Sequence, residues 1–199
     1  PIDAMTTRRR VLLLGSAAAL AGCAWTPDRS HDGPDAPWAA PLRRPVRTAW
    51  VLSSGGPRGF THVGVLKAMQ ELRLAPDLIV GASVGALVGS ICASGVDAAQ
   101  IETMALEIQP MGLARLALGQ AENLSGAPIA ELVRRMSLVP RLERMPLAMA
   151  CVATRRVDGE SVAFTAGDVG LAVQASAAVE GRFTPVRIRG ERYADADLR

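Results

Sequence analysis

Two successive segments between residues 48 and 95 each combine a short apolar run, a glycine-containing turn and a helix-like pattern. The apolar runs at residues 50–52 and 78–80 are typical of buried parallel strands, and apolar side chains then recur at helical spacing. Strands that alternate with helices build layered domains around a sheet. We therefore expect an α/β fold with a mostly parallel central sheet, and chemistry at the tips of the strand-to-helix turns.

The second turn carries a candidate nucleophile, Ser83. It lies in a G-x-S-x-G pattern with Gly81, Ala82, Val84 and Gly85, between an apolar run and a stretch of small apolar residues. Glycine on both sides is expected where side chains would collide across a tight, strained turn. The pattern also arises by chance in chains rich in glycine and alanine, but the strand before it and the helix after it favour a nucleophile elbow.

The first turn, at residues 54–59, is a glycine-rich loop that opens a helix. Its free N–H groups can hold a phosphate or the oxyanion of a tetrahedral intermediate, so both alternatives stand at this point. A Walker loop is excluded because no Gly-Lys-Ser or Gly-Lys-Thr follows. A dinucleotide site is disfavoured because the acidic candidate, Asp77, precedes its strand instead of following it.

Residues 54–68 have the sequence S-G-G-P-R-G-F-T-H-V-G-V-L-K-A, and residues 81–89 have the sequence G-A-S-V-G-A-L-V-G. Together these motifs resemble the patatin-like phospholipase family, over roughly residues 48–198. The resemblance implies a three-layer α/β/α fold and a lipid ester substrate. It implies an oxyanion hole formed by Gly55, Gly56 and Arg58. It also implies a dyad without histidine, in which Ser83 works with an aspartate, and Asp195 stands where that aspartate is expected.

Histidine scarcity limits the alternatives to this dyad. The chain has two histidines, and a Ser-His-Asp triad would have to use His62, because His31 falls in a proline-rich segment. The resembled family has a histidine at the position of His62, where it is not the base, so we assign His62 a structural role. Asp195 is then the general base, which requires burial to raise its pKa or the oxyanion hole to supply most of the catalysis.

Several positions depart from the family pattern. Asp197 stands where a small residue is usual after the aspartate, Ser54 replaces the first glycine of the loop, and Glu180 replaces a proline. The chain also ends at Arg199, where family members usually continue, so we expect the C-terminal part of the domain to be missing. These departures support an alternative function: a catalytically impaired lipoprotein that serves as a lipid-binding or envelope module.

The chain opens with the features of an export signal. Met5 is a plausible start, residues 8–10 are arginines, and residues 11–19 are apolar but too short to span a membrane. Residues 20–23, Leu-Ala-Gly-Cys, are similar to the lipobox of bacterial lipoproteins, which implies acylation of Cys23 and a membrane anchor at the bacterial cell envelope. An ordinary secretory signal is the alternative, and the export route stays open.

Domain organisation follows from composition. Residues 1–23 form the signal, residues 24–47 are rich in proline and polar residues, and residues 48–199 are long enough for one domain with a core. We expect residues 24–47 to be an unordered tether in which His31 is solvated. A net charge of +3 and the absence of basic runs with interleaved aromatics argue against a nucleic acid partner.

The rest of the domain predicts further elements. Helices are expected at residues 97–109 and 128–136 and from an N-terminal cap at Asp168 to about residue 178. Strands are expected at residues 147–154 and 160–165. Residues 113–123 are interpreted as core helix, with a lid as the alternative. Cys92 and Cys151 are expected to be buried thiols instead of a disulfide, and no residue cluster has metal-ligand spacing, so no metal or cofactor is expected.

Overall fold

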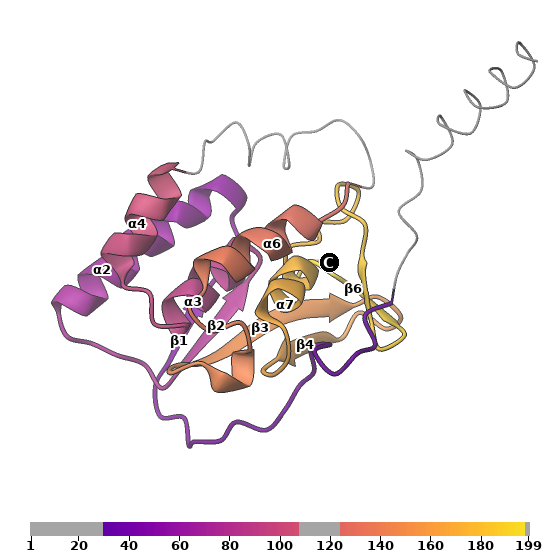
Figure 1. Cartoon of the computed structure of the whole chain (residues 1–199), viewed down its shortest axis with the longest axis horizontal. Helices are drawn as coiled ribbons and strands as arrows, with labels where there is room; N and C mark the ends of the chain where they lie inside the picture. Colours follow the sequence, from indigo (N-terminus) through magenta and orange to yellow (C-terminus); the bar gives the residue numbers. More distant parts are fainter. Residues whose placement is uncertain (1–29, 108–123, 198–199) are drawn as a thin grey trace, which may run out of the picture.

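A computed structural model describes residues 30–107 and 124–197 of the chain (Figure 1). The strands are β1 (Ala49–Leu52), β2 (Leu78–Ala82), β3 (Ala148–Arg155), β4 (Ser161–Phe164), β5 (Val186–Ile188) and β6 (Glu191–Ala194). The α-helices are α2 (Thr61–Glu71), α3 (Val84–Ala93), α4 (Ala98–Glu107), α6 (Ala127–Met136) and α7 (Val169–Ser176). Two short 3-10 helices are η1 (Gly56–Phe60) and η2 (Leu142–Arg144).

The strands form one six-stranded sheet in which β1 pairs with β2, β2 with β3, β3 with both β4 and β6, and β6 with β5. The α/β class is confirmed, but the sheet is mixed. Pairings β1–β2 and β2–β3 are parallel, whereas β3–β4, β3–β6 and β5–β6 are antiparallel. For β3–β4 and β5–β6 the cause is loop length, because the turns at residues 156–160 and 189–190 are too short for the crossover that parallel neighbours need.

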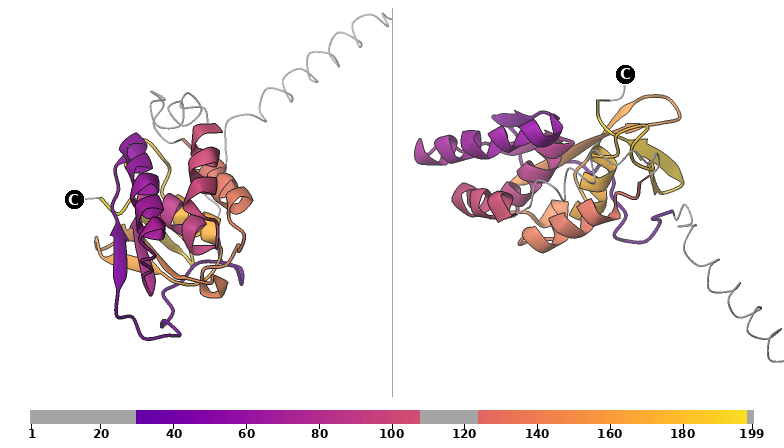
Figure 2. Two further views of the ribbon diagram at one scale, coloured as in Figure 1. Left: turned by 90° about the vertical axis from the view of Figure 1, so that its left-hand side faces the viewer. Right: turned by 90° about the horizontal axis from the view of Figure 1, so that it is seen from above.

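The helices α3 and α7 lie directly on the sheet and contact each other, so they cover the same face. The helix α6 packs on α7, and α4 packs on α2 and α3, which builds an outer helical layer (Figure 2). Gly89 of α3 permits the close packing of this helix on the sheet, since a Cβ there would lie 2.8 Å from Ile79 Cγ2 of β2. Val51 points to the opposite face and is 74% exposed, so the described residues leave that part of the expected third layer uncovered.

The core fills the space between α3, α7 and the sheet. Phe164 of β4 and Tyr193 of β6 meet edge to face, with ring centroids 4.9 Å apart. The largest fully buried side chains are Phe164, Leu66, Ile79, Ile91, Ile101, Leu142, Met149, Ile188, Val88, Val96, Val133 and Val169. They come from nearly every element, so the described part of the chain packs around one core.

Part of the proline-rich segment is ordered, which corrects the expectation of a free tether. His31 N–H donates to the Arg187 carbonyl at 2.8 Å, and Trp38 N–H donates to the Ala166 carbonyl at 3.0 Å. Ala36 is 2% exposed. The composition of the segment predicted too little apolar surface for order, but main-chain hydrogen bonds to the domain hold residues 30–40 in place.

The other predicted elements are confirmed with small shifts at their ends. The glycine loop is itself folded as η1, so the first helix begins at Thr61. Asp168 caps α7 by accepting a hydrogen bond from Leu171 N–H at 2.7 Å. Cys92 and Cys151 are free thiols, and burial raises the pKa of Cys151 to about 12. The signal segment with Cys23 and the expected helix or lid at residues 113–123 lie outside the described residues.

A spanning helix is not found in the part of the chain that the structure describes. Its helices are too short or too polar to cross a bilayer.

Candidate active site

Ser83 occupies the sharp turn between β2 and α3. Its backbone has φ 53° and ψ −120°, a conformation that costs free energy for any residue with a side chain. The turn is held by a hydrogen bond from Ser83 N–H to Ser176 Oγ, at 2.8 Å. Ser83 is 8% exposed, and it lies at the N-terminus of α3, where backbone N–H groups favour developing negative charge.

The glycines beside Ser83 are required by close packing, as expected. A Cβ at Gly81 would lie 2.6 Å from Ala86 Cα, across the turn. A Cβ at Gly85 would lie 2.0 Å from the Leu52 carbonyl oxygen, so Gly85 is constrained by the end of β1 instead of by the turn. The serine turn is therefore in direct contact with the end of β1.

We expect Gly85→Ala to destabilise the fold by about 3 kcal/mol, because backbone surrounds the new methyl group. Gly64→Ala is the matched control: Gly64 lies in α2 with no atom within 4 Å of its Cβ position. That variant should gain about 0.5–1 kcal/mol from helix propensity. Urea denaturation of both variants measures the difference, and equal stabilities would contradict the packing argument.

The ends of β2 and β6 meet along one edge of β3. Thr154 pairs with β4 and also with Ala194 of β6, and these two partners must lie on opposite edges. β6 therefore shares the edge that β2 occupies. β2 ends at Ala82, opposite Val152, and β6 ends at Ala194. The next residues, Ser83 and Asp195, approach each other from opposite directions.

Asp195 is buried, with an exposed fraction of 5%. Its N–H donates to the Ala178 carbonyl at 2.9 Å, and its Oδ1 accepts from Asp197 N–H at 2.9 Å. Burial raises the pKa of Asp195, which the N–H of Asp197 and the hydroxyl of Ser83 partly oppose, while the negative charge of Asp197 raises it further. Oδ2 is buried without a partner at full hydrogen-bond geometry. The Ser83 hydroxyl is therefore close enough to the carboxyl to influence its pKa, but it forms no hydrogen bond of full geometry to Oδ2.

The glycine loop lies against the serine turn. A Cβ at Gly59 would lie 2.1 Å from Val84 Cγ1, so only glycine allows η1 to sit this close. Arg58 N–H donates within the loop, to the Gly55 carbonyl at 3.2 Å. The N–H groups of Gly55 and Gly56 have no recorded acceptor in the part of the chain that the structure describes. Of the three donors expected for an oxyanion hole, these two are the ones left available.

His62 holds the loop in place. Its Nε2 lies 2.8 Å from the Ser53 carbonyl oxygen, which can only accept, so Nε2 carries the proton. This contact ties α2 to the end of β1 and agrees with the structural role expected for His62.

Two of the departures from the family pattern contact each other. The Ser54 hydroxyl donates a hydrogen bond to Asp197 Oδ2, and so joins the glycine loop to the segment after β6. Asp197 also donates its N–H to Asp195. Asp197 therefore sits between the loop and the carboxyl without displacing Asp195 from its buried position.

Three contributors to the site were missed by sequence reasoning. Ser176 holds the backbone of Ser83, Ala178 holds that of Asp195, and Gly59 admits the loop. Ser176 had a detectable signal, as a hydroxyl in an otherwise small and apolar helix. The carbonyl of Ala178 had none, because any residue supplies one.

The serine on its strained strand-to-helix turn, the buried carboxyl of Asp195 and the glycine loop lie together at the strand ends, an arrangement typical of hydrolases with an α/β fold. The chain belongs to the patatin-like phospholipase family, whose family model matches residues 50–198. An uncharacterized NTE family protein of Mycobacterium tuberculosis is 32% identical over 156 residues, which is 76% of this chain and 43% of the relative. Lysophospholipase nte1 of Neurospora crassa is 36% identical over 74 residues, 34% of this chain and 5% of the relative.

Solved structures show the same fold. VipD from Legionella pneumophila superposes with a TM-score of 0.57 at 18% identity, over 90% of this chain and 52% of VipD. The type III effector protein ExoU superposes with a TM-score of 0.50 at 19% identity, over 71% of this chain and 41% of ExoU. The chain spans less than half the length of the mycobacterial relative, at 43%.

Proposed function

We propose that the protein is a serine-dependent lipid acyl hydrolase, of phospholipase A, lysophospholipase or esterase type, with Ser83 as nucleophile and Asp195 as general base. The observation that carries the proposal is the convergence of Ser83 and the buried Asp195 at the facing ends of β2 and β6. The family membership and the similarity to a lysophospholipase support a lipid ester as the substrate.

In the first step, Ser83 Oγ attacks the ester carbonyl carbon and Asp195 takes the hydroxyl proton. The N–H groups of Gly55 and Gly56 donate to the oxyanion, which forms beside the N-terminus of α3. Asp195 then gives the proton to the leaving alcohol, and an acyl-enzyme remains. In the second step, Asp195 accepts a proton from the water that attacks the acyl carbonyl. It then returns this proton to Ser83 Oγ as the bond to the acyl group breaks and the fatty acid leaves.

Burial matters to this mechanism because an ordinary carboxylate is a weak base for a hydroxyl. The raised pKa of Asp195 brings its basicity closer to that required, and the low exposure of the site strengthens the oxyanion hydrogen bonds.

We also propose acylation of Cys23 and a location at the bacterial cell envelope, which the lipobox-like sequence supports. A lipid anchor would keep the enzyme at the membrane that holds its substrate.

Labelling with a fluorophosphonate probe tests the proposal directly. The purified full chain is treated in detergent and compared with Ser83→Ala and Asp195→Asn. We expect labelling to require Ser83 and to weaken without Asp195. A folded wild-type protein that takes up no label would favour the second function, a non-catalytic lipid-binding module, which the replacement of a small residue by Asp197 supports.

The charge of Asp197 gives a separate prediction. That charge raises the pKa of Asp195, so Asp197→Asn should lower it and shift the acid limb of kcat/KM to lower pH. Ser54→Ala is the control, because it removes the hydrogen bond to Asp197 and keeps the charge. The acid limb of the kcat/KM profile of Ser54→Ala should therefore not move to lower pH. Asp197 is exposed, so the shift should shrink with added salt; identical profiles for Asp197→Asn and wild type at low salt would refute this role.

A further inference from the structure

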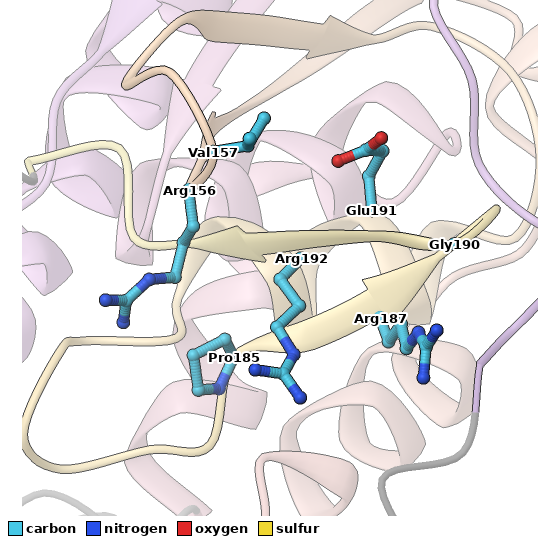
Figure 3. Close-up of a pocket in the computed structure, with 7 residues that line it drawn as sticks. All are labelled: Arg156, Val157, Pro185, Arg187, Gly190, Glu191 and Arg192. Atoms are coloured by element: carbon cyan, nitrogen blue, oxygen red, sulfur yellow. The ribbon is translucent and has the colours of Figure 1, made fainter.

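The hairpin of β5 and β6 carries a cationic pocket that shares no residue with the candidate active site. The pocket has a volume of about 560 Å³, and three of its lining residues are Arg156, Arg187 and Arg192. Figure 3 shows their side chains extending on the same side of the hairpin as Pro185, whereas Glu191 extends on the opposite side. The pocket therefore presents guanidinium groups beside a small apolar surface.

The backbone brings these arginines together. Arg187 and Arg192 are direct cross-strand partners in the β5–β6 ladder. The N–H of Arg156 donates to the Arg192 carbonyl at 2.8 Å, which places the third arginine next to the pair. Like charges directly opposite each other destabilise a sheet. An anion between them would turn this repulsion into attraction.

Neighbouring carboxylates do not form ion pairs with all three arginines of the pocket. Arg156 pairs with Glu180 at 2.6 Å. The two acidic side chains of the adjoining turn both pair with Arg155 instead. Within residues 30–107 and 124–197, the structure records no ion pair for the Arg187 guanidinium. Among the described residues, the positive charge of Arg187 is therefore not offset by an ion pair.

We propose that this pocket is a phosphate-binding site, in which Arg187 and Arg192 bind the phosphate group of an anionic ligand. The planar guanidinium presents paired N–H donors that match phosphate oxygens, and two such groups face the same cavity. Pro185 supplies apolar contact for the carbon skeleton that carries the phosphate. A lipid head group and a free phosphate compound share this chemistry. Binding here does not depend on chemistry at Ser83.

The test uses the full chain in nonionic detergent, with Ser83→Ala in every sample so that lipid is not consumed. Isothermal calorimetry measures binding of sodium phosphate in one arm. The other arm uses mixed micelles that contain phosphatidylglycerol, with phosphatidylcholine micelles for comparison. We expect Arg187→Gln with Arg192→Gln to weaken binding by about tenfold or more. The matched control, Arg43→Gln with Arg135→Gln, removes the same charge from exposed positions and should stay within about twofold.

Loss of binding in both arms, confined to the pocket variant, supports a site for phosphate from either source. Loss in the micelle arm alone identifies a lipid head group, and loss in the phosphate arm alone identifies a soluble compound. No binding by the parent protein, or equal losses in the two double variants, would overturn the proposal. Melting temperatures of the parent and of both double variants check that each is folded, and Arg187→Gln alone replaces the pocket variant if that variant fails to fold.

Discussion

Replacement of Ser83 by alanine should lower the turnover of phospholipid esters on the order of 10⁴-fold or more. In the proposed mechanism the hydroxyl forms the covalent bond to the acyl group, and alanine has no group that could replace it. Alanine keeps the backbone N–H that donates to Ser176, so the turn should persist and the melting temperature should change little. The measurement is release of fatty acid from phosphatidylglycerol in detergent micelles.

Ser90→Ala is the matched control for this variant. Ser90 lies in the same helix, and its hydroxyl donates to the Leu87 carbonyl at 3.0 Å, within that helix. We expect its turnover to remain within about threefold of wild type, because the hydroxyl does not reach the site. Full activity in folded Ser83→Ala protein would exclude Ser83 as the nucleophile.

Asp195→Asn should lower turnover by about 10²–10⁴-fold, the usual contribution of general acid–base catalysis. Asparagine keeps the shape of the side chain and can still accept the N–H of Asp197, but it cannot take the proton of Ser83. The pH profile of wild-type turnover tests the role of Asp195 as general base in a second way. The proposed mechanism requires ionised Asp195, so activity should fall as pH falls through a pKa that burial has raised.

The same variant should be more stable than wild type at neutral pH. The pKa of Asp195 is higher in the folded state than in the unfolded chain, so folding favours the protonated form. That stability is fully present below the unfolded pKa, about 3.9, and is lost as pH rises through the folded pKa. The substituted asparagine is neutral throughout, so the melting temperature of the variant should exceed that of wild type at pH 7, and the gap should narrow in acid. A gap that widens in acid would contradict the raised pKa.

The local features of the site could be predicted from sequence because each depends on neighbouring residues. The glycines that flank Ser83 predict its strained turn. The helical pattern that follows Asp168 predicts the cap at that residue. The glycine loop can be predicted for the same reason. Its fold into η1, in which the N–H of Arg58 donates to the Gly55 carbonyl, cannot be predicted from sequence. This fold depends on how the loop packs on Val84.

The pairing of strands could not be predicted in this way. Alternation of strand and helix favoured a parallel sheet, but the short connections around Gly159 and Gly190 turn the chain back on itself. The position of β6 on the edge shared with β2 comes from contacts between distant residues. The ordering of residues 30–40 was missed for a related reason, since the hydrogen bonds at His31 and Trp38 use main-chain atoms, which composition does not reveal.

The head-on meeting of β2 and β6 also sets when the proposed site can form. A ribosome releases Ser83 early and Asp195 much later, and the two come together only after the β5–β6 hairpin has docked on β3. A chain caught during synthesis therefore carries Ser83 without Asp195 beside it. The order of the strands along the chain delays assembly of the proposed site until folding is complete.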